Sequence, residues 1–497
     1  MASQDFAFQK IFPVFSSDGV RRRVALWGGA VIVACVAILF AKASDYAFET
    51  FTSLIQQSLW WALLITPTVF ALLTWLTAGI LRPTRGSGIP QVIAALERYD
   101  QTFRGKNLSI LMSAGKLFLT TLALLGGASV GREGPTVHIG ASVMYQVGRL
   151  FRFRDPYDLS HFLLAGGASG IAAAFNAPLA GVVFAIEELS GRFEHRFSGT
   201  LLTAVIVGGV VSLGLLGNYT YFGKISVSLP LDRAWIAIIL CGVSGGLLGG
   251  SFALTILASV AGKIRWLNKL RSPRPILFAA ACGLSLVALA AIAGHGAFGT
   301  GYAQARSLLQ GTPLVGHEFG VMKWIANFIS NIAGIPGGLF SSALAVGAGI
   351  GYNLSVFLPD VDPHAMVLLG MCAYLTGLTQ APLTSAVISM ELTDTGELLL
   401  PILATVLLAR GVSGLICKTP IYRGMADLML EQAQEAQAQP EAAARQEAQA
   451  QPETAARQEA QAQPEAVARQ GAQAQPEAYS EHPTRNRPGQ DMDPNQS

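Results

Sequence analysis

The chain has 497 residues, of which 51% are hydrophobic and only 13% are charged, and its mean hydropathy is +0.44. Soluble domains carry about 25% charged residues, so these values exclude an ordinary soluble protein and indicate a membrane protein. The five cysteines are far apart without a C-x-x-C pair, and the seven histidines show no ligand spacing. We therefore expect no disulfide framework, no metal site and no other cofactor.

The net charge of +3 divides between two unlike parts of the chain. From Glu431 to Ser497 there are 11 acidic and 5 basic residues, a net charge of −6, whereas the body before Glu431 carries +9. The tail repeats Gln-Pro-Glu every twelve residues and has almost nothing apolar to bury. We predict a low-complexity tail over 431–497 that is disordered or loosely helical and is not a regulatory domain. The basic residues of the body are spread over loops beside apolar runs, which fits membrane topology and indicates no nucleic-acid partner.

The first membrane span is predicted close to the N-terminus. Arg21, Arg22 and Arg23 precede an uncharged run over 24–41, which is long enough for most of a bilayer crossing. Basic residues favour the cytoplasmic side, so we expect a cytoplasmic segment over 1–20 and a membrane domain over 21–430. A cleaved signal peptide is the alternative, although the segment before its apolar part would be unusually long.

Two kinds of apolar segment follow. Stretches of spanning length lie at 54–81, 107–130, 198–217, 234–262, 275–294 and 398–417. Shorter or broken stretches lie at 86–96, 131–147, 163–175, 177–189, 334–350 and 367–392. Irregular backbone at membrane depth is tolerated only where protein or a water-filled cavity covers it. A set of such half-helices therefore indicates a transport site. The alternative is that they are core helices that only hold the lipid-facing spans together, which would suit one such segment better than six.

The membrane domain contains an internal repeat. Residues 163–166 and 177–179 reappear as 367–370 and 381–383, an offset of 204 that also relates Glu187 to Glu391. At an offset of 207, residues 131–135 correspond to 338–342. We predict two halves, approximately 21–217 and 234–430, with the substrate site where they meet. Parallel and inverted repeats are both compatible with these offsets.

Three of the broken segments begin with glycine and proline, at 86–90, 131–135 and 334–338. A helix N-terminus presents unpaired N–H groups and the positive end of the macrodipole, so several of them together favour an anion. One such segment alone would be weak evidence, because glycines also allow close helix packing. The residues expected to shape these helix starts are Gly86, Gly88, Pro90, Gly131, Arg132, Gly134, Pro135 and Gly338.

These motifs resemble the signature of the CLC family of chloride channels and chloride/proton exchangers. The resemblance rests on Gly-Ser-Gly-Ile-Pro at 86–90, Gly-Arg-Glu-Gly-Pro-Thr at 131–136, Phe-Asn-Ala-Pro-Leu-Ala-Gly at 175–181 and Pro-Ile-Tyr at 420–422, and it covers approximately residues 20–430. It implies an all-α polytopic membrane fold of broken, tilted helices in two inverted halves. It also implies a homodimer in the lipid bilayer with one anion pathway per subunit. The short N-terminus and the absence of a folded domain after Arg423 favour the bacterial inner membrane, with both termini cytoplasmic.

The resemblance also implies the anion ligands. By analogy, chloride is held by the hydroxyls of Ser87 and Tyr422 and by the backbone N–H groups of Leu339 and Phe340. A hydroxyl donates one directed hydrogen bond and carries no charge that would trap the ion. From the residues alone, Tyr422 fits an interfacial aromatic side chain and Ser87 fits a plain N-cap. Many members have Gly-x-Phe-x-Pro where this chain has Gly-Leu-Phe-Ser-Ser at 338–342, so this helix start is expected to differ in detail.

Glu133 is the first candidate for proton chemistry. A carboxylate inside an apolar run is costly and indicates a function, and this one lies beside helix N–H groups that suit an anion. We expect ionised Glu133 to occupy an anion position and block the pathway, and protonated Glu133 to swing aside for chloride. The resemblance implies that this glutamate is the gate and the external proton carrier. The structural alternative is a salt bridge to Arg132 that holds a turn.

The repeat separates the neighbouring acids Glu187 and Glu188. Glu187 has the counterpart Glu391, as expected for a position that ties up backbone in both halves, whereas Glu188 corresponds to Leu392. The unmatched acid is the better functional candidate, because neighbours on a helix point about 100° apart and seldom share a task. The resemblance implies that Glu188 transfers protons on the internal side.

We therefore predict that the protein exchanges chloride for protons, with a passive chloride channel on the same scaffold as the alternative. An intramembrane serine protease is a more distant alternative. Gly-Ala-Ser-Gly at 167–170 has the G-x-S-G form around Ser169, and His138, His161 or His295 could supply a base. Close packing of small residues explains these glycines better, so we expect no enzyme.

Overall fold

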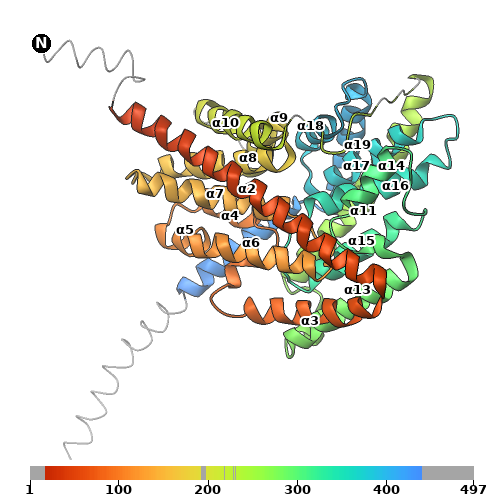
Figure 1. Ribbon diagram of the computed structural model, residues 1–497, viewed down its shortest axis with the longest axis horizontal. Helices are drawn as coiled ribbons and strands as arrows, with labels where there is room; N and C mark the ends of the chain where they lie inside the picture. Colours follow the sequence, from red (N-terminus) through yellow and green to blue (C-terminus); the bar gives the residue numbers. More distant parts are fainter. Residues whose placement is uncertain are drawn as a thin grey trace, which may run out of the picture. The chain divides into compact units, whose positions relative to one another are not determined.

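The computed structural model describes residues 17–191, 198–217, 219–225, 227, 229 and 231–438, and most of these residues are helical (Figure 1). The chain divides into two compact units, Met1–Leu430 and Glu431–Ser497. The predicted acidic tail corresponds to the second unit, of which residues 431–438 are helical. The rest of the predicted tail, residues 439–497, lies outside the described residues, as does most of the predicted segment 1–20.

The first half of the membrane domain contains nine α-helices and one π-helical turn in the described part of the chain. In chain order they are α2 (Ser17–Gln57), α3 (Trp60–Leu76), α4 (Ile89–Glu97), α5 (Gln101–Asn107), α6 (Ile110–Leu125), α7 (Glu133–Leu150), α8 (Pro156–Phe175), α9 (Pro178–Phe184), the π-helical turn Ala185–Ser190 and α10 (Ser198–Leu216). The long α2 packs against α6, α7, α8 and α10, and it runs diagonally among the helices of the first half in Figure 1.

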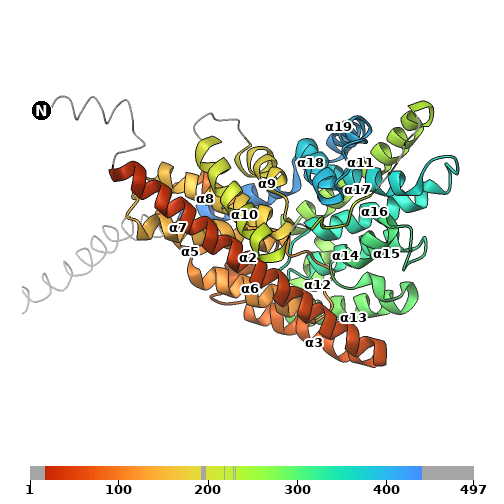
Figure 2. The same ribbon diagram turned by 45° about the horizontal axis from the view of Figure 1, so that its top comes forward.

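The second half repeats this arrangement. Its helices are α11 (Leu231–Val260), α12 (Arg265–Arg271), α13 (Pro275–Ala293), α14 (Tyr302–Leu309), α15 (Phe319–Ile332), α16 (Phe340–Ser355), α17 (Pro363–Thr379), α18 (Pro382–Thr393) and α19 (Leu399–Ile416). Residues 421–430 are helical as well. The halves also contact one another through α3 and α13, which lie side by side in Figure 2.

Equivalent helices begin and end with the same local chemistry. Asp155 accepts a hydrogen bond from the N–H of Tyr157 at 3.1 Å and begins α8, and Asp362 accepts one from the N–H of His364 at 2.9 Å and begins α17. Both caps place a side-chain oxygen on an otherwise unpaired N–H. Both helices end on a residue in the left-handed conformation, with φ values of 54° at Asn176 and 59° at Gln380. The predicted repeat is therefore visible in the structure helix by helix.

Glycines bring the paired helices of each half into close contact. A Cβ atom on Gly140 of α7 would collide with the carbonyl oxygen of Gly166 of α8, and the reverse holds as well. Gly347 of α16 and Gly370 of α17 meet in the same way. Because backbones approach this closely only without side chains between them, these glycines fix the packing of α7 on α8 and of α16 on α17.

Six helical stretches in the described part of the chain are long and apolar enough to cross a membrane. They are Asp18–Gln57, Gln101–Leu125, Gly199–Leu216, Asp232–Val260, Pro275–Ile292 and one that begins at Leu399. The chain is thus an all-α, multi-pass membrane protein. Its shorter helices Trp60–Leu76 and Pro363–Thr379 are apolar but do not reach this length.

The structure differs from the sequence prediction at several boundaries. The helix that holds the predicted span 24–41 continues past the charged residue Lys42 to Gln57, and its Asp45 pairs with Arg132. The predicted stretch 54–81 is not one span, since α2 ends at Gln57 and α3 runs only from Trp60 to Leu76. The stretch 163–175, predicted to be short, belongs to the 20-residue α8.

Candidate functional site

The three glycine-rich segments predicted to shape an anion site meet one another. Gly131 and Gly338 exchange two N–H···O bonds of 2.6 Å, and Gly337 donates to the carbonyl of Gly86 at 3.2 Å. Directly after these contacts begin α4 at Ile89, α7 at Glu133 and α16 at Phe340. Three helix N-termini therefore converge, as the sequence predicted.

The pairing of Gly131 with Gly338 also shows how the halves are related. The two glycines are equivalent at the repeat offset of 207, and each donates to the other in an antiparallel bridge. Reciprocal contacts between equivalent residues are what a local two-fold axis produces. The two halves are therefore related by a local two-fold axis that passes between Gly131 and Gly338.

Two hydroxyls assigned to the anion lie beside these helix starts. The side chains of Ser87 and Tyr422 are buried, and neither hydroxyl has a hydrogen-bond partner among the described residues. Ser87 Oγ lies against Gly134, where a Cβ atom would collide with it. The Tyr422 phenol lies next to the Ser87 hydroxyl and within electrostatic range of Glu188 and Glu133. Both hydroxyls lie at converging helix N-termini and can donate to an anion there.

The position of Tyr422 is fixed by its neighbour in the chain. Arg423 forms an ion pair with Glu97, the last residue of α4. This pair joins the helix over 421–430 to α4, whose first turn follows Ser87. The two hydroxyls thus reach the same place from segments more than 300 residues apart in the sequence.

Leu339 and Phe340 form the start of α16, and both side chains are buried. The first N–H groups of an α-helix have no partner within it, so the backbone here can donate to an anion. The ring of Phe340 packs against Phe175 and Phe184, with centroid distances of 5.9 and 6.4 Å. These contacts fix the helix start even though the proline of the usual motif is replaced by Ser342.

The carboxylate of Glu133 lies on the N-terminus of α16. Its Oε2 atom accepts from the N–H of Arg132 at 3.1 Å, from the N–H of Ser341 at 3.3 Å and from the Ser341 hydroxyl. The side chain is almost completely buried. It therefore occupies a nest of donors that would suit a halide equally well.

Arg132 contacts Glu133 through its backbone only. The Arg132 guanidinium donates to Asp45 and, at 2.9 Å, to the carbonyl of Ala41, both in α2. No ion pair joins the Arg132 and Glu133 side chains in the described part of the chain. The alternative in which Glu133 only pairs with Arg132 to hold a turn thus has no geometric support.

The neighbouring acids Glu187 and Glu188 differ as the repeat suggested. Glu187 accepts from Leu383 N at 3.1 Å and Thr384 N at 2.6 Å in the first turn of α18. Its counterpart Glu391 accepts from Leu179 N at 3.2 Å and Ala180 N at 2.7 Å in the first turn of α9. Each glutamate therefore caps a helix of the opposite half. Glu188 is half-buried in the π-helical turn, with no such backbone partner among the described residues.

Comparison with known proteins identifies the family of this chain. The family model described as voltage gated chloride channel matches residues 69–414. The chain belongs to the voltage gated chloride channel family. Relatives include the "H(+)/Cl(-) exchange transporter ClcA" of Yersinia pestis and of Yersinia pseudotuberculosis, each 29% identical over 440 residues that cover 82% of this chain and 87% of the relative.

Solved structures share the fold of this family member. The chain is similar to a slow cyanobacterial Cl⁻/H⁺ antiporter, with a TM-score of 0.71, 24% identity and coverage of 83% of this chain and 98% of the antiporter. It is also similar to a CLC-type fluoride/proton antiporter, with a TM-score of 0.70, 21% identity and coverage of 82% and 99%. These similarities establish the fold.

Two buried lysines of this family member donate to backbone carbonyls, and one of them does so beside Ser87. Lys116 donates to the carbonyls of Gly86 at 3.0 Å and Arg85 at 3.4 Å, next to Ser87. Lys323, equivalent at the offset of 207, donates to the carbonyls of residues 297–299 at 3.2, 3.1 and 2.7 Å. Sequence reasoning missed Lys323, together with the whole of α15 on which it lies. Applying the repeat offset to Lys116 would have found it.

The geometry around Ser169 does not support a protease in this family member. Ser169 Oγ is buried and has no hydrogen-bond partner among the described residues, so no histidine is in position to activate it. The hydroxyl instead lies against Gly208 of α10. His138 directs Nε2 at the carbonyl of Asn107, 3.0 Å away. Small residues here serve helix packing.

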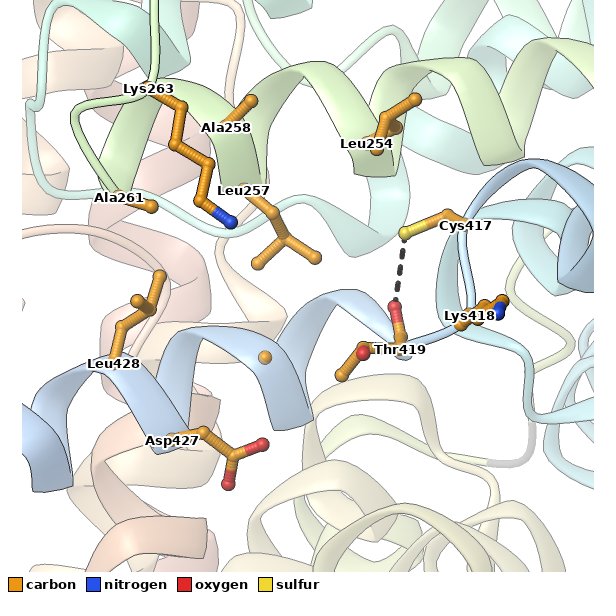
Figure 3. A pocket seen from close by; sticks show the side chains of 11 residues that line it. Leu254, Leu257, Ala258, Ala261, Lys263, Cys417, Lys418, Thr419, Asp427 and Leu428 are labelled. Carbon is orange, nitrogen blue, oxygen red and sulfur yellow. Dashed lines mark hydrogen bonds between the residues drawn. The ribbon is translucent and has the colours of Figure 1, made fainter.

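A cavity of about 300 Å³ lies outside the anion site (Figure 3). It is bounded by the end of α11 and by residues 417–428, with Lys263, Lys418 and Asp427 in its wall. The Cys417 thiol donates to the carbonyl of Thr419 inside it, at 3.2 Å. None of the residues assigned to chloride or protons lines this cavity.

Proposed function

We propose that this protein exchanges chloride for protons across a membrane. The observation that carries the proposal is the position of Glu133, whose carboxylate accepts two N–H bonds and one O–H bond where three helix N-termini converge. A carboxylate and a halide compete for such donors, because both are monovalent acceptors. Protonation removes the charge and frees the donors. Relatives named as H⁺/Cl⁻ exchange transporters support the same activity.

In this mechanism the anion occupies the space between the two unpaired hydroxyls and the start of α16. Ser87 and Tyr422 donate their hydroxyl hydrogens, and Leu339 and Phe340 contribute backbone N–H groups. These donors hold chloride without a full positive charge, which permits its release. At the external end of the anion pathway, the Glu133 carboxylate and chloride replace one another, and Glu133 carries the proton there.

Glu188 supplies the proton route on the internal side. It lies within electrostatic range of the Tyr422 phenol, as Glu133 does, so the two acids approach the anion site from different elements. The π-helical turn that holds Glu188 is a local irregularity of a kind often found at functional sites. Its repeat partner Leu392 cannot take a proton, so only the first half supplies this acid.

The assembly and location are proposed on the family resemblance. Two copies associate in the bacterial inner membrane, each with its own pathway, and both termini face the cytoplasm. The three arginines at 21–23 at the start of α2 support this orientation.

The proposal is tested with purified protein in liposomes that contain high chloride and a pH dye. Valinomycin and potassium hold the voltage near zero. We expect chloride efflux to drive protons inward against their own gradient. Glu133→Gln and Glu188→Gln should each abolish proton uptake, whereas chloride movement through Glu188→Gln should persist. The same replacement at Glu318, an exposed residue before α15, serves as the matched control and should pump normally.

If wild-type protein moved chloride while protons only followed their own gradient, the protein would be a passive channel. If proton uptake survived in Glu133→Gln, this residue would have no part in coupling. Absence of any anion movement would contradict transport itself.

A further inference from the structure

The hydroxyl of Ser341 is a donor that the helix N-terminus does not require. Ser341 is the second residue of α16 and is buried. Both its N–H and its hydroxyl point at the same carboxylate oxygen of Glu133, which belongs to the opposite half of the repeat. The N–H would be present with any residue here, but the hydroxyl depends on serine.

The next residue shows that this contact is not a general property of serines at the helix start. Ser342 is also buried, yet its hydroxyl donates back to the carbonyl of Leu339 at 3.1 Å, within its own helix. Two adjacent serines thus have different tasks. One closes the first turn of α16, and the other binds a side chain 208 positions away.

The space around the carboxylate is limited on a third side by Gly131. A Cβ atom at this position would lie 2.7 Å from Glu133 Oε2 and 2.9 Å from Ser341 Oγ. The reciprocal bonds between Gly131 and Gly338 hold the starts of α7 and α16 together. The carboxylate therefore fits between a backbone without a side chain and a serine that donates twice.

Few other charged or titratable groups act on this carboxylate. Electrostatic neighbours of Glu133 are Arg132, Tyr221 and Tyr422. Among the elements packed on α7, α2 contributes Asp45, which is bonded to Arg132, and α6 contributes Lys116, which is bonded to backbone. Next to Asp45, α2 also carries the exposed residues Lys42, Tyr46 and Glu49. The other titratable residues of these elements lie farther along them: Asp18, Arg21, Arg22, Arg23 and Cys35 on α2, Glu97 on α4, Tyr157, Asp158 and His161 on α8, and Tyr352 on α16.

We propose that Ser341 is a positioning residue that sets how firmly ionised Glu133 holds the anion position. The inference rests on the proposed function. A hydroxyl donor stabilises a carboxylate more than a neutral acid, so it favours the blocked state. A proton from the outer solution that binds Oε2 turns this acceptor into a donor and cancels the interaction. The Ser341 hydroxyl and the two N–H groups are then free for chloride.

The expected consequence is a shift in the pH dependence of transport. Without the Ser341 hydroxyl, the ionised state of Glu133 loses one charge-assisted hydrogen bond, and protonation succeeds at a lower proton concentration. We expect half-maximal chloride flux in Ser341→Ala at a pH about one unit higher than in wild type, equivalent to about tenfold fewer protons. Gly131→Ala, which crowds the carboxylate out of its position, should shift the profile in the same direction.

The experiment measures initial chloride efflux from liposomes as a function of external pH. It compares wild type, Ser341→Ala and Gly131→Ala, with Ser342→Ala as the neighbouring control that should superimpose on wild type. Glu133→Gln and the double variant Glu133→Gln/Ser341→Ala complete a double-mutant cycle, which compares the effect of Ser341→Ala with and without the carboxylate. Both should give flux independent of pH, because the shift acts through the carboxylate.

The inference is overturned if the profile of Ser341→Ala coincides with that of wild type, or if Ser341→Ala shifts the profile equally in the Glu133→Gln background. Loss of the proposed function has a different signature. In that case Glu133→Gln would keep proton coupling or a pH-dependent flux, whatever Ser341→Ala does.

Discussion

At the scale of single residues, the proposed anion site consists of neutral donors. The hydroxyls of Ser87 and Tyr422 are buried without a partner among the described residues, and such groups are rare because desolvating them is costly. Lys116 is buried beside Ser87 but directs its charge at the carbonyls of Arg85 and Gly86. A chloride bound by hydroxyl and N–H donors alone is held weakly enough to leave.

Removal of one of these donors should separate chloride binding from folding. We expect Tyr422→Phe to weaken chloride binding about fivefold, since one hydrogen bond contributes about 1 kcal/mol. Without chloride, the thermal stability of Tyr422→Phe should equal or exceed that of wild type, because an unpaired buried hydroxyl is lost. Calorimetric titration with chloride and thermal unfolding in detergent check both parts.

Tyr374→Phe is the control for this change. Tyr374 on α17 is also buried and has no hydrogen-bond partner for its hydroxyl among the described residues, but it is not assigned to the anion. Its replacement should leave chloride affinity unchanged. Equal loss of affinity in both variants would show that the Tyr422 hydroxyl has no specific role.

The sequence predicted most of the candidate site at this scale, but not its contacts. Glu133, Ser87 and the helix starts follow from local motifs. The bond from Ser341 to Glu133 joins residues 208 positions apart, and no local pattern encodes it. The sequence showed that Ser342 stands where many family members have proline. It did not show where the serine hydroxyls point, because that depends on the side chains packed around them.

At the scale of elements, the two halves are joined by reciprocal helix caps. Glu187 accepts two N–H bonds at the start of α18, and Glu391 accepts two at the start of α9. Both helices begin with proline after alanine and have no side-chain cap of their own. Each half therefore supplies the capping group that the other lacks.

We expect Glu187→Ala and Glu391→Ala to destabilise the protein by similar amounts, about 1 kcal/mol each, because a lost N-terminal cap costs about this much. Glu188→Ala should lower the unfolding temperature less, since Glu188 caps no helix in the described part of the chain. Thermal unfolding in detergent measures the three variants side by side. A larger loss of stability in Glu188→Ala than in Glu187→Ala would contradict the division of roles.

The sequence indicated that Glu187, and not Glu188, caps a helix, but it did not predict the conformation of the turn that holds both acids. The repeat pairs Glu187 with Glu391, and the caps confirm that pairing. The π-helical turn Ala185–Ser190 was not predicted, because one extra residue in a turn leaves no clear mark in the hydrophobic pattern.

At the scale of the whole molecule, the repeat organises the membrane domain. Helices α7 and α8 correspond to α16 and α17, and the same glycine contacts hold each pair together. The sequence predicted the helical membrane class, the repeat and the broken helices. It missed α15, since buried polar residues such as Lys323, Asn327 and Ser330 interrupt its apolar pattern. Their partners lie in other segments: Ser129 bonds Asn327 at 2.7 Å and Ser330 at 3.0 Å.

The central claim is that chloride and protons are coupled at Glu133, and the reversal voltage of the reconstituted protein tests it most directly. Under a fixed chloride gradient, the voltage of zero net flux is measured while external pH is changed. Coupled exchange predicts that this voltage shifts with the pH gradient in wild type and stays at the chloride equilibrium value in Glu133→Gln. A wild-type reversal voltage that depends on chloride alone, at every pH gradient, would contradict the account.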